Sequence, residues 1–514
     1  MYSYLDIKIY SHFFKIFNID SRITNHIYKF IKRYTQYGLV RDINGKMKYA
    51  PIKVYGASDK FRSEYRFHIN ALDEFIEFLT QVGIELNQYK MEYVSLYSPE
   101  KINVKMNPGW IPRDYQTPMI KYFENKDRNS KFLDLQTGKG KSYIATQAIV
   151  NMGLKTIIIV RPLFIEKWGQ DLIKMTNVKP KDILVVQGNN HFKGLVDLAM
   201  NNNLENPFII LSNKTLQAFI SRYELDPKAS YEEYGFYLED LYQMLGVGIK
   251  LVDEIHLDFH LNFKIEMYTH IPYTFGLSAT LFHDDPFIEK MYKVMFPLAS
   301  RYNTKELDKY INSYAILYNQ DYNAKIKTHE FGVKNYSHHA YEKSIMKNPK
   351  YLKQYMELIK YCVDRGFIND YKYGEKLAIY VSSIKMATSL TEYLKQQYAD
   401  LDVRRYVEDD PYENLLDPDI RITTIMSGGT GHDISNLKMV LLTVAISSSQ
   451  SNVQTLGRLR KLDDIPVRFY YLTNLNVKKH VEYHEKKKEM LLFRAKTYKE
   501  FFYPDILFKM DKRY

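Results

Sequence analysis

Short runs of apolar residues, separated by amphipathic segments, constrain the fold of this chain more than any other feature. One set, between residues 111 and 300, comprises FLDLQ, KTIIIV, DILVVQ, PFIILS, IKLVDE and YTFGLSAT. A second set, within 371–477, comprises KLAIYVSS, DIRITTIMS, MVLLTVA and VRFYYLT. Strands that are apolar on both faces and alternate with helices are typical of parallel sheets covered on both sides. The sequence therefore predicts an α/β protein with two parallel-sheet lobes in tandem.

Different patterns flank these two sets. Near the N-terminus, alternating runs on either side of Asn44-Gly45 predict a β-hairpin, and INALDEFIEFLTQVGI predicts a helix. A polar stretch rich in Tyr and Lys separates the two sets, and the last part, with HEKKKEMLLFRAKTYKEFF, indicates a charged helix. We therefore expect an N-terminal α+β accessory domain at 1–108, a first lobe at 109–304, a helical connection at 305–370, a second lobe at 371–477 and a C-terminal helical tail at 478–514.

Composition limits the class of protein. The chain of 514 residues exceeds one compact core, and its only cysteine, Cys362, excludes a disulfide framework and a cysteine zinc cluster. We expect a cytoplasmic protein, because we find no signal peptide and no apolar run long enough to cross a membrane. The net charge of +12 suggests an anionic partner, with nucleic acid first. A generic basic surface is the alternative.

The stretch LDLQTGKGKSYIATQAIV, Leu133 to Val150, resembles a phosphate-binding loop between a strand and a helix. Gly138 and Gly140 permit a tight turn, Lys141 can reach phosphates, and the hydroxyl of Ser142 can bind Mg²⁺. The opening glycine of the general formula is replaced by Leu135. The alternative is a strand-to-helix turn that carries Gly-Lys-Ser by chance.

A pair of carboxylates ends a later strand of the same α/β unit. In IKLVDEIH, Asp253 and Glu254 follow the apolar run, at the edge where parallel sheets build their sites. Phosphoryl transfer needs one carboxylate for Mg²⁺ and one to orient the attacking water, and Asp253 and Glu254 fit these roles respectively. A buried or capping acidic pair is the alternative when this motif is taken alone.

Together these motifs resemble a known family. QTGKGKS, VDEIH and GLSAT, in this order, resemble motifs I, II and III of superfamily 2 helicases and translocases, in which alanine is common at the position of Leu135. WIPRDYQ is similar to the adenine-reading segment, IIIVRPLFIEKW to motif Ia and IILSNKTLQ to motif Ib. In the second set, IMSGGTGHDIS resembles motif V and QTLGRLRK motif VI. The resemblance covers about 110–475 and is nearest to phage branch-migration helicases of the UvsW kind.

The resemblance implies two RecA-like lobes that bind ATP and Mg²⁺ between them. Asp253 and Ser142 would hold the metal, and Glu254 would activate water. Arg458 would stabilise the transferred phosphoryl group, with Arg460 or Lys461 as second cation, because the family's last arginine of motif VI is here Lys461. Contacts to ATP would come from Arg113, Gln116, Thr137, Gly138, Lys139, Gly140, Lys141, Ser142 and Asp433.

Other residues are implied to couple the ATP site to the facing lobe and to nucleic acid. His256 would act through Gln454, and the hydroxyls of Ser278 and Thr280 would link the metal site to the nucleic-acid side. A satisfied core histidine and a strand-end turn are the alternatives. Backbone contacts would come from Arg161 in motif Ia, Ser212 in motif Ib, and Thr424, whereas Trp168 at helical spacing is more often a core residue.

The cluster SDKFRSEYRFH in the N-terminal segment interleaves basic and aromatic residues. Strand alternation would direct Phe61, Tyr65 and Phe67 into the core, and a set of basic residues toward solvent. The set is Lys60, Arg62, Arg66 and His68. A DNA-contacting face and an ordinary solvated strand face are equally compatible with this pattern.

The leading hypothesis is an ATP-dependent DNA helicase or translocase that remodels forked or branched DNA, as in recombination and DNA repair. Its ATP hydrolysis would be stimulated by nucleic acid, its partners would include replication or recombination proteins, and a phage-encoded protein would act in the host cytoplasm. The alternatives are an RNA helicase, a translocase that displaces proteins without unwinding, and an ATP-switched nucleic-acid-binding scaffold.

Overall fold

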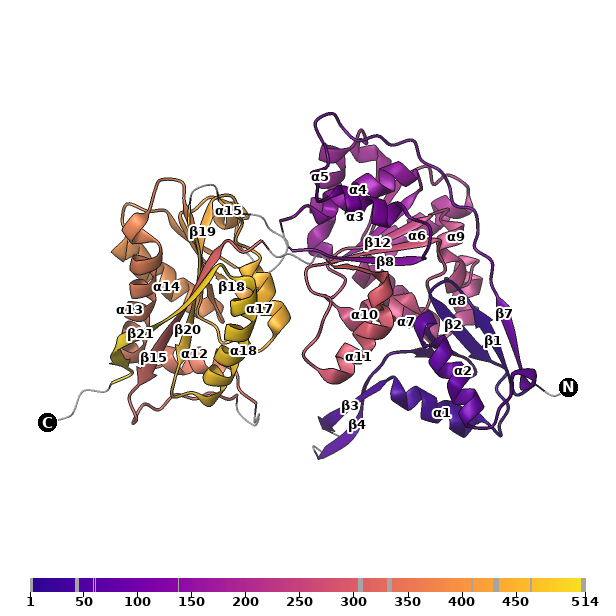
Figure 1. Cartoon of the computed structure of the whole chain (residues 1–514), viewed down its shortest axis with the longest axis horizontal. Coiled ribbons are helices and arrows are strands. Elements are labelled where there is room, and N and C mark those ends of the chain that lie inside the picture. The colour runs from indigo at the N-terminus through magenta and orange to yellow at the C-terminus, as the bar shows by residue number, and fades with distance from the viewer. Residues whose placement is uncertain are drawn as a thin grey trace. The chain divides into compact units, whose positions relative to one another are not determined.

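The chain folds into two compact units, Met1–Thr304 and Lys305–Tyr514 (Figure 1). The computed structural model describes residues 3–41, 46–58, 60, 62–136, 138–303, 308–330, 335–407, 410–428, 434–462 and 465–509. Within these residues each unit contains a seven-stranded sheet, and the first unit also carries a small N-terminal α+β domain. No helix in the described ranges is both long and apolar enough to cross a membrane. The predicted pair of RecA-like lobes with an N-terminal α+β domain is confirmed.

The N-terminal domain is a mixed sheet covered by two helices. Its strand order is β5-β6-β2-β1-β7, and a separate antiparallel ribbon is formed by β3 and β4. The ribbon confirms the predicted hairpin, although the Asn44-Gly45 turn itself lies outside the described residues. The elements are β1 Leu5–Ile9, β2 Phe13–Phe17, α1 Thr24–Arg33, β3 Thr35–Arg41, β4 Met47–Val54, β5 Ala57–Ser58, β6 Tyr65–His68, α2 Leu72–Gln81 and β7 Tyr89–Tyr93.

The first lobe is an all-parallel sheet in the order β10-β11-β9-β12-β13-β8-β14. Helices α3, α4 and α5 pack on one face, and α6, α7, α10 and α11 on the other (Figure 1). The strands are β8 Ser130–Asp134, β9 Thr156–Val160, β10 Ile183–Val186, β11 Phe208–Ser212, β12 Ile249–Val252, β13 Tyr273–Ser278 and β14 Arg301–Asn303. The helices are α3 Thr117–Glu124, α4 Lys141–Met152, α5 Ile165–Met175, α6 Asn189–Met200, α7 Asn213–Leu225, α8 Pro227–Tyr234, α9 Leu241–Met244, α10 Phe259–Glu266 and α11 Pro286–Met295.

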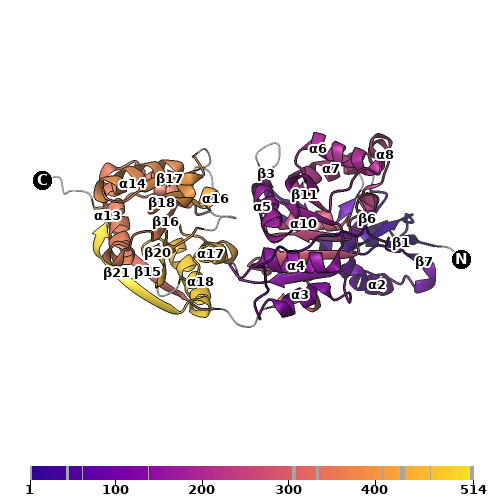
Figure 2. The ribbon, with the colours of Figure 1, turned by 90° about the horizontal axis from the view of Figure 1, so that it is seen from above.

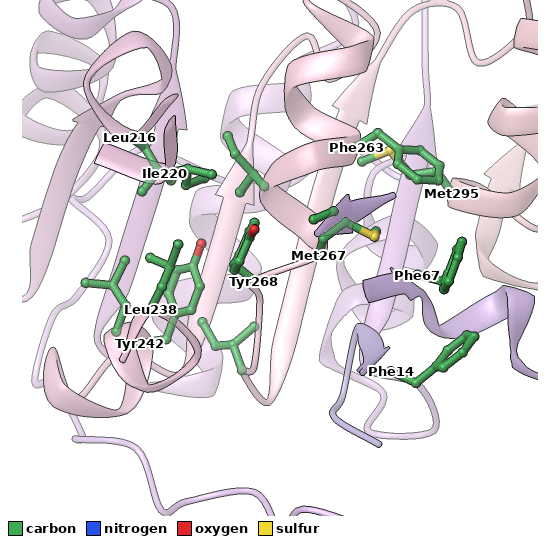
Figure 3. Packing of buried hydrophobic residues seen from close by; sticks show 14 of the residues in the cluster. Phe14, Phe67, Leu216, Ile220, Leu238, Tyr242, Phe263, Met267, Tyr268 and Met295 are labelled. Carbon is green, nitrogen blue, oxygen red and sulfur yellow. The ribbon is translucent and has the colours of Figure 1, made fainter. Parts of the chain in front are cut away.

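The N-terminal domain and the first lobe share one hydrophobic core. Phe14 and Phe67 of the domain belong to the same buried cluster as Phe263, Met267 and Tyr268 of the lobe (Figure 3). Burial of contiguous apolar surface is the main favourable term in packing. The domain is therefore an integral part of the first unit.

Arg66 corrects one prediction at this junction. Its side chain is only 2% exposed and donates to Glu239 of the lobe and to Glu64, with its guanidinium 4.6 Å from the Tyr268 ring centre. His68 is buried as well, because β6 lies inside the sheet and its second face is covered by the lobe. Strand alternation alone could not reveal that both faces are covered. Arg66 forms a structural ion pair with Glu239, and the prediction that it contacts nucleic acid was wrong.

The second lobe is also an all-parallel sheet, in the order β17-β18-β16-β19-β20-β15-β21. Helices α12, α13 and α14 share one buried cluster with the sheet, and α15, α17 and α18 contribute to the cluster on its other face. Figure 2 shows α13 and α14 on one side of the strands and α17 and α18 on the other. The strands are β15 Ile311–Gln320, β16 Lys376–Val381, β17 Val403–Tyr406, β18 Ile420–Thr424, β19 Leu437–Leu442, β20 Val467–Asn474 and β21 Thr497–Leu507. The helices are α12 His338–Met346, α13 Pro349–Gly366, α14 Ile384–Gln397, α15 Glu413–Leu416, α16 Ile425–Gly428, α17 Ser449–Leu456 and α18 Lys478–Arg494.

Two strands of this sheet depart from the predicted helical segments. The connection at 305–370 contains β15, which pairs with β20 and β21, before α12 and α13 begin. The tail at 478–514 is helical only over α18, and β21 then forms the sheet edge. Tyr, Asn and Gln side chains obscure the apolar run in β15. The edge strand β21 carries the charged residues Lys499 and Glu500, which protect an exposed sheet edge but leave the strand without a continuous apolar run.

Candidate functional site

The loop after β8 forms a cradle at the start of α4. Gly138 and Gly140 have φ values of 82° and 83°, the left-handed region that glycine adopts without strain. A Cβ atom on Gly140 would lie 2.6 Å from Nε2 of Gln116, which donates to the carbonyl of Lys139. Leu135 is buried, and its amide donates to the carbonyl of Ser278 at 3.0 Å. The backbone of Leu135 therefore joins the loop to β13, and its side chain packs in the core. This position does not need the glycine of the general phosphate-loop formula.

Lys141 begins α4 and points back into the loop. Its Nζ lies 3.4 Å from the carbonyl oxygen of Leu135 and 3.5 Å from Oε1 of Glu254. No described side chain caps α4 at Gly140. The first backbone N–H groups of a helix have no partner within it and carry the positive end of its dipole. This helix start is consequently suited to bind a phosphate group.

The acidic pair follows β12 and is held in a specific geometry. Asp253 accepts a hydrogen bond from Nε1 of Trp168 at 3.0 Å and another from the amide of Glu254 at 2.9 Å. Burial raises the pKa of Asp253, and the adjacent carboxylate of Glu254 raises it further. Glu254 has a φ of 45°, which is uncommon for a residue with a Cβ atom and costs conformational energy. This backbone turn brings the Glu254 carboxylate toward Lys141.

Trp168 was a candidate core residue in the sequence, and its bond to Asp253 adds a second role. The side chain is fully buried in the cluster of α3, α4 and α5. The two residues are separated by 85 positions in the chain, so no spacing pattern predicts the contact. Trp168 and the amide of Glu254 together orient the Asp253 carboxylate.

His256, Ser278 and Thr280 form a connected group beside the acidic pair. Nδ1 of His256 and Oγ of Ser278 are 2.7 Å apart, and Oγ of Ser278 accepts from the amide of Thr280 at 2.9 Å. Burial lowers the pKa of His256 to about 4, so the ring is neutral at pH 7. The sequence prediction that these residues act together is compatible with this geometry, but their coupling to the second lobe stays a prediction.

The residues present fit a nucleotide with Mg²⁺. The hydroxyl of Thr280 is buried and has no hydrogen-bond partner among the described residues. The Thr280 hydroxyl, the amides at the start of α4 and the Lys141 ammonium supply hydrogen-bond donors, and the two carboxylates supply acceptors. Oxygen ligands and a nearby ammonium are what a magnesium–phosphate group requires. Ser142, next to Lys141 on α4, can supply the hydroxyl ligand.

Other residues predicted for the ATP site lie close to this loop or outside the described part of the chain. The amide of Arg113 donates to Oε1 of Gln116, so the predicted adenine-reading residues are adjacent. The Lys139 ammonium lies 5.8 Å from the ring centre of Tyr115. Thr137 falls outside the described residues.

The predicted nucleic-acid residues of the first lobe lie around Asp258. Nε of Arg161, after β9, donates to the Asp258 carboxylate at 2.8 Å, and Asn213 at the start of α7 donates to the same oxygen. Ser212 precedes α7 and is buried. The loops after β9, β11 and β12 thus converge. Asp258 was not anticipated from the sequence, because it follows the apolar strand by several turn residues.

In the second unit, the predicted residues are described only in part. Thr424 ends β18, and its hydroxyl donates to Oγ of Ser427 at 2.9 Å. The Arg460 guanidinium donates to the carbonyl of Gly457, within the turn after α17, whereas Lys461 is exposed. Asp433 and the side chain of Gln454 lie outside what the structure describes. Arg458, in the same turn, stays a predicted cation for the transferred phosphoryl group.

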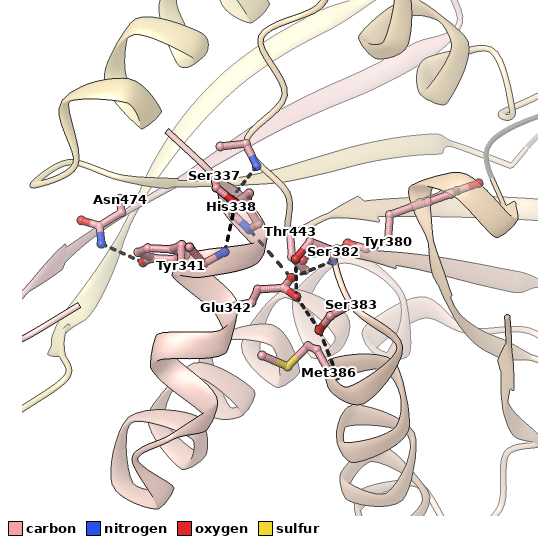
Figure 4. A network of polar contacts seen from close by, with 12 residues as sticks. Ser337, His338, Tyr341, Glu342, Tyr380, Ser382, Ser383, Met386, Thr443 and Asn474 are labelled. Carbon is pink, nitrogen blue, oxygen red and sulfur yellow. Dashed lines mark hydrogen bonds and ion pairs between the residues drawn. The ribbon is translucent and has the colours of Figure 1, made fainter. Parts of the chain in front are cut away.

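A buried polar cluster in the second unit was not predicted (Figure 4). The carboxylate of Glu342, on α12, accepts from the amide and hydroxyl of Ser382 at 2.9 and 2.6 Å and from the hydroxyl of Ser383 at 3.2 Å. His338 lies 3.8 Å from it, and burial lowers the pKa of that ring well below its usual value. Burial raises the pKa of Glu342 to about 7. The run KLAIYVSS gave the only sequence signal, two serines directly after a strand.

This pKa makes the second unit's stability depend on pH. Between pH 4.5, the usual pKa of a glutamate, and about pH 7, folded Glu342 keeps its proton, whereas the unfolded chain has released it. Stability is therefore greatest below this range and falls as pH rises through 7, by about 3 kcal/mol. We expect the free energy of unfolding of Glu342→Gln, relative to the unsubstituted protein, to increase between pH 5 and pH 8. Urea unfolding of both proteins at each pH measures this; a difference that is independent of pH would contradict it.

Comparisons with known proteins give only a likeness of fold. No protein-family model matches the sequence, and no curated protein matches it significantly. S. cerevisiae Dbp5 bound to RNA and ADP BeF3 is 11% identical, with a TM-score of 0.49 over 76% of this chain and 90% of that chain. T4 UvsW is 13% identical, with a TM-score of 0.31 over 97% of this chain and 99% of that chain. At these values, residue roles must be assigned from the chain's own geometry.

Proposed function

We propose that the chain is an ATP-dependent DNA helicase or translocase that remodels forked or branched DNA. The observation that carries the proposal is the group formed by Lys141, Asp253 and Glu254 at the carboxyl edge of a parallel sheet. One carboxylate is fixed by Trp168, and the other lies 3.5 Å from the lysine ammonium at the start of a helix. The order of the flanking motifs, which resembles superfamily 2, supports a motor on nucleic acid.

In this proposal the first lobe binds ATP and begins its hydrolysis. The amides at the start of α4 and the ammonium of Lys141 hold the β- and γ-phosphates, and Gln116 with Arg113 reads the adenine. Ser142 and Asp253 would hold Mg²⁺, which would neutralise phosphate charge when bound. Glu254 accepts a proton from the attacking water and orients it.

The second lobe would complete the reaction and convert it into movement. Arg458 stabilises the charge that develops on the transferred phosphoryl group, with Arg460 or Lys461 as second cation. Asp433, which lies outside the described residues, would contact the nucleotide. His256 and Gln454 transmit the state of the nucleotide, assisted by Ser278 and Thr280.

Nucleic acid would be held mainly through its backbone. Arg161 after β9, Ser212 at the end of β11 and Thr424 at the end of β18 would supply polar groups of the kind that contact phosphates. The choice of DNA follows from the resemblance of the sequence to branch-migration helicases. Sequence-specific base contacts are not part of the proposal.

A panel of substrates tests this function. The full chain should process forks, four-way junctions or R-loops only when ATP is present, and duplex or forked DNA should stimulate its ATP hydrolysis. Stimulation by RNA alone would contradict the DNA assignment. Stimulation by DNA without strand separation on any substrate would indicate a translocase that displaces proteins.

A further inference from the structure

A groove lies at the base of the β3–β4 ribbon in the first unit. Its volume is about 430 Å³, and it is bounded by α1, the ribbon, β5, β6 and α10. Aromatic and apolar side chains line it, including Tyr28, Ile31, Tyr37, Ile52, Tyr65 and Phe67. None of these residues belongs to the proposed ATP site.

The groove is positively charged. Lys32, Lys53, Arg62 and Lys264 are among its described lining residues, and Glu224 is the single carboxylate among them. Glu224 is engaged by Lys264 at 2.5 Å and by the hydroxyl of Tyr268 at 2.8 Å. Neither β3 nor β4 contains an acidic residue. A polyanion is therefore the complementary ligand by charge.

The ribbon continues this surface beyond the groove (Figure 1). The rings of Tyr37 and Tyr49 stack with centres 5.8 Å apart and 16° between planes. Tyr49 is 71% exposed, and its cross-strand partner Leu39 is 66% exposed. Single exposed apolar side chains are ordinary, whereas several gathered on one surface, as on this ribbon, mark an interaction site. Exposed aromatic faces beside cations are typical of platforms on which unpaired bases stack.

The base of the ribbon is fixed to the first lobe. Nε2 of His260, on α10, contacts the carbonyl of Val54 at 3.0 Å. Tyr55 is buried, with its ring centre 5.0 Å from His260 and 5.2 Å from Phe263. Helix α10 follows the acidic pair of the ATP site after a short turn. A ligand on the ribbon would thus contact a segment that is continuous with that site.

We propose that this groove and the Tyr37–Tyr49 face form a binding site for single-stranded nucleic acid. Phosphates lie against Lys53 and Arg62, and unpaired bases stack on the tyrosine rings. Cations at the rim disfavour a purely apolar peptide, and paired bases do not expose faces for stacking. The inference rests on the proposed nucleic-acid function and adds a contact outside the helicase motifs.

Charge reversal in the full chain tests the phosphate contacts. We expect Lys53→Glu combined with Arg62→Glu to weaken binding of fluorescein-labelled oligothymidylate at least tenfold in anisotropy titrations. The slope of log affinity against log salt should fall by roughly 0.7 for each lost phosphate contact. The matched control reverses two exposed lysines of the same unit, Lys90→Glu on β7 at the opposite sheet edge and Lys101→Glu. Equal weakening in both double variants would overturn the site.

A fluorescent label tests the stacking surface. Cys362 is the only cysteine and is fully buried, so Leu39→Cys introduces a single accessible thiol opposite Tyr49. We expect the label's emission to change with oligothymidylate and not with a blunt duplex, and Tyr49→Ala to weaken single-strand binding on the order of tenfold. An unchanged signal at saturating oligothymidylate, or a larger response to duplex, would overturn the proposal.

The two proposals fail in different ways. If the unsubstituted protein binds no nucleic acid and its ATP hydrolysis is not stimulated, the proposed function fails and the groove proposal fails with it. If it binds and is stimulated but the Lys53, Arg62 and Tyr49 variants behave as the unsubstituted protein does, only the groove proposal fails. ATP hydrolysis without nucleic acid should be equal in all these variants, which confirms that they are folded.

Discussion

Replacing Glu254 with glutamine is expected to lower the kcat of nucleic-acid-stimulated ATP hydrolysis by about 10²- to 10⁴-fold. The amide keeps the size and position of the side chain but cannot accept the proton of the attacking water. ATP affinity should be nearly unchanged, because Lys141 and the start of α4 still bind the phosphates. Steady-state hydrolysis and equilibrium binding of a fluorescent ATP analogue separate these two effects.

Two companion variants make the result specific. Lys141→Ala should lose ATP binding as well as hydrolysis, because it removes the ammonium that lies against the loop and, in the proposed function, binds the phosphates. Glu232→Gln, on the exposed surface of α8, should change neither. If Glu254→Gln hydrolyses ATP at the normal rate, Glu254 is not the base. If that variant loses turnover but keeps biological activity, an ATP-switched scaffold replaces the motor.

The strand pattern predicted most of the fold because both lobes bury their strands on two faces. Runs such as KTIIIV and MVLLTVA correspond to β9 and β19, where every residue of the strand is buried. The prediction failed where a strand's apolar character is diluted or faces solvent. β15 alternates buried and partly buried positions over its first half, and β21 has only its last residue buried.

The candidate site was predicted at the level of residues but not of contacts. The motifs identified Lys141, Asp253 and Glu254 through the order of glycine loop and acidic pair. They could not show that Trp168 holds Asp253 or that Asp258 binds Arg161, because those pairs join loops far apart in sequence. Arg66 shows the reverse error, since its basic character suggested solvent whereas Glu239 of the lobe neutralises it within the core.

In the proposed function, the turn after α17 supplies the cation of the second lobe that stabilises the transferred phosphoryl group. We expect Arg458→Ala to reduce kcat by about 10³-fold, the scale of an arginine that stabilises a phosphoryl transition state. ATP affinity should change much less, because the charge that Arg458 meets develops during the reaction. The matched control is Arg404→Ala on β17, which removes a partly exposed guanidinium paired with Asp402, the residue before that strand.

Arg460 and Lys461 can be distinguished by the same assay. The Arg460 guanidinium donates to the carbonyl of Gly457 in its own turn, which favours a role in shaping the turn, whereas Lys461 is exposed. Lys461→Ala should then lower kcat more than Arg460→Ala does, and Arg460→Ala should chiefly lower thermal stability. Lys461→Arg should raise kcat, because a planar guanidinium can grip two phosphate oxygens where an ammonium acts as a point charge. A larger loss of kcat in Arg460→Ala, with Lys461→Arg unchanged, would assign the second cation to Arg460, because the contact with Gly457 would then have to open during the reaction.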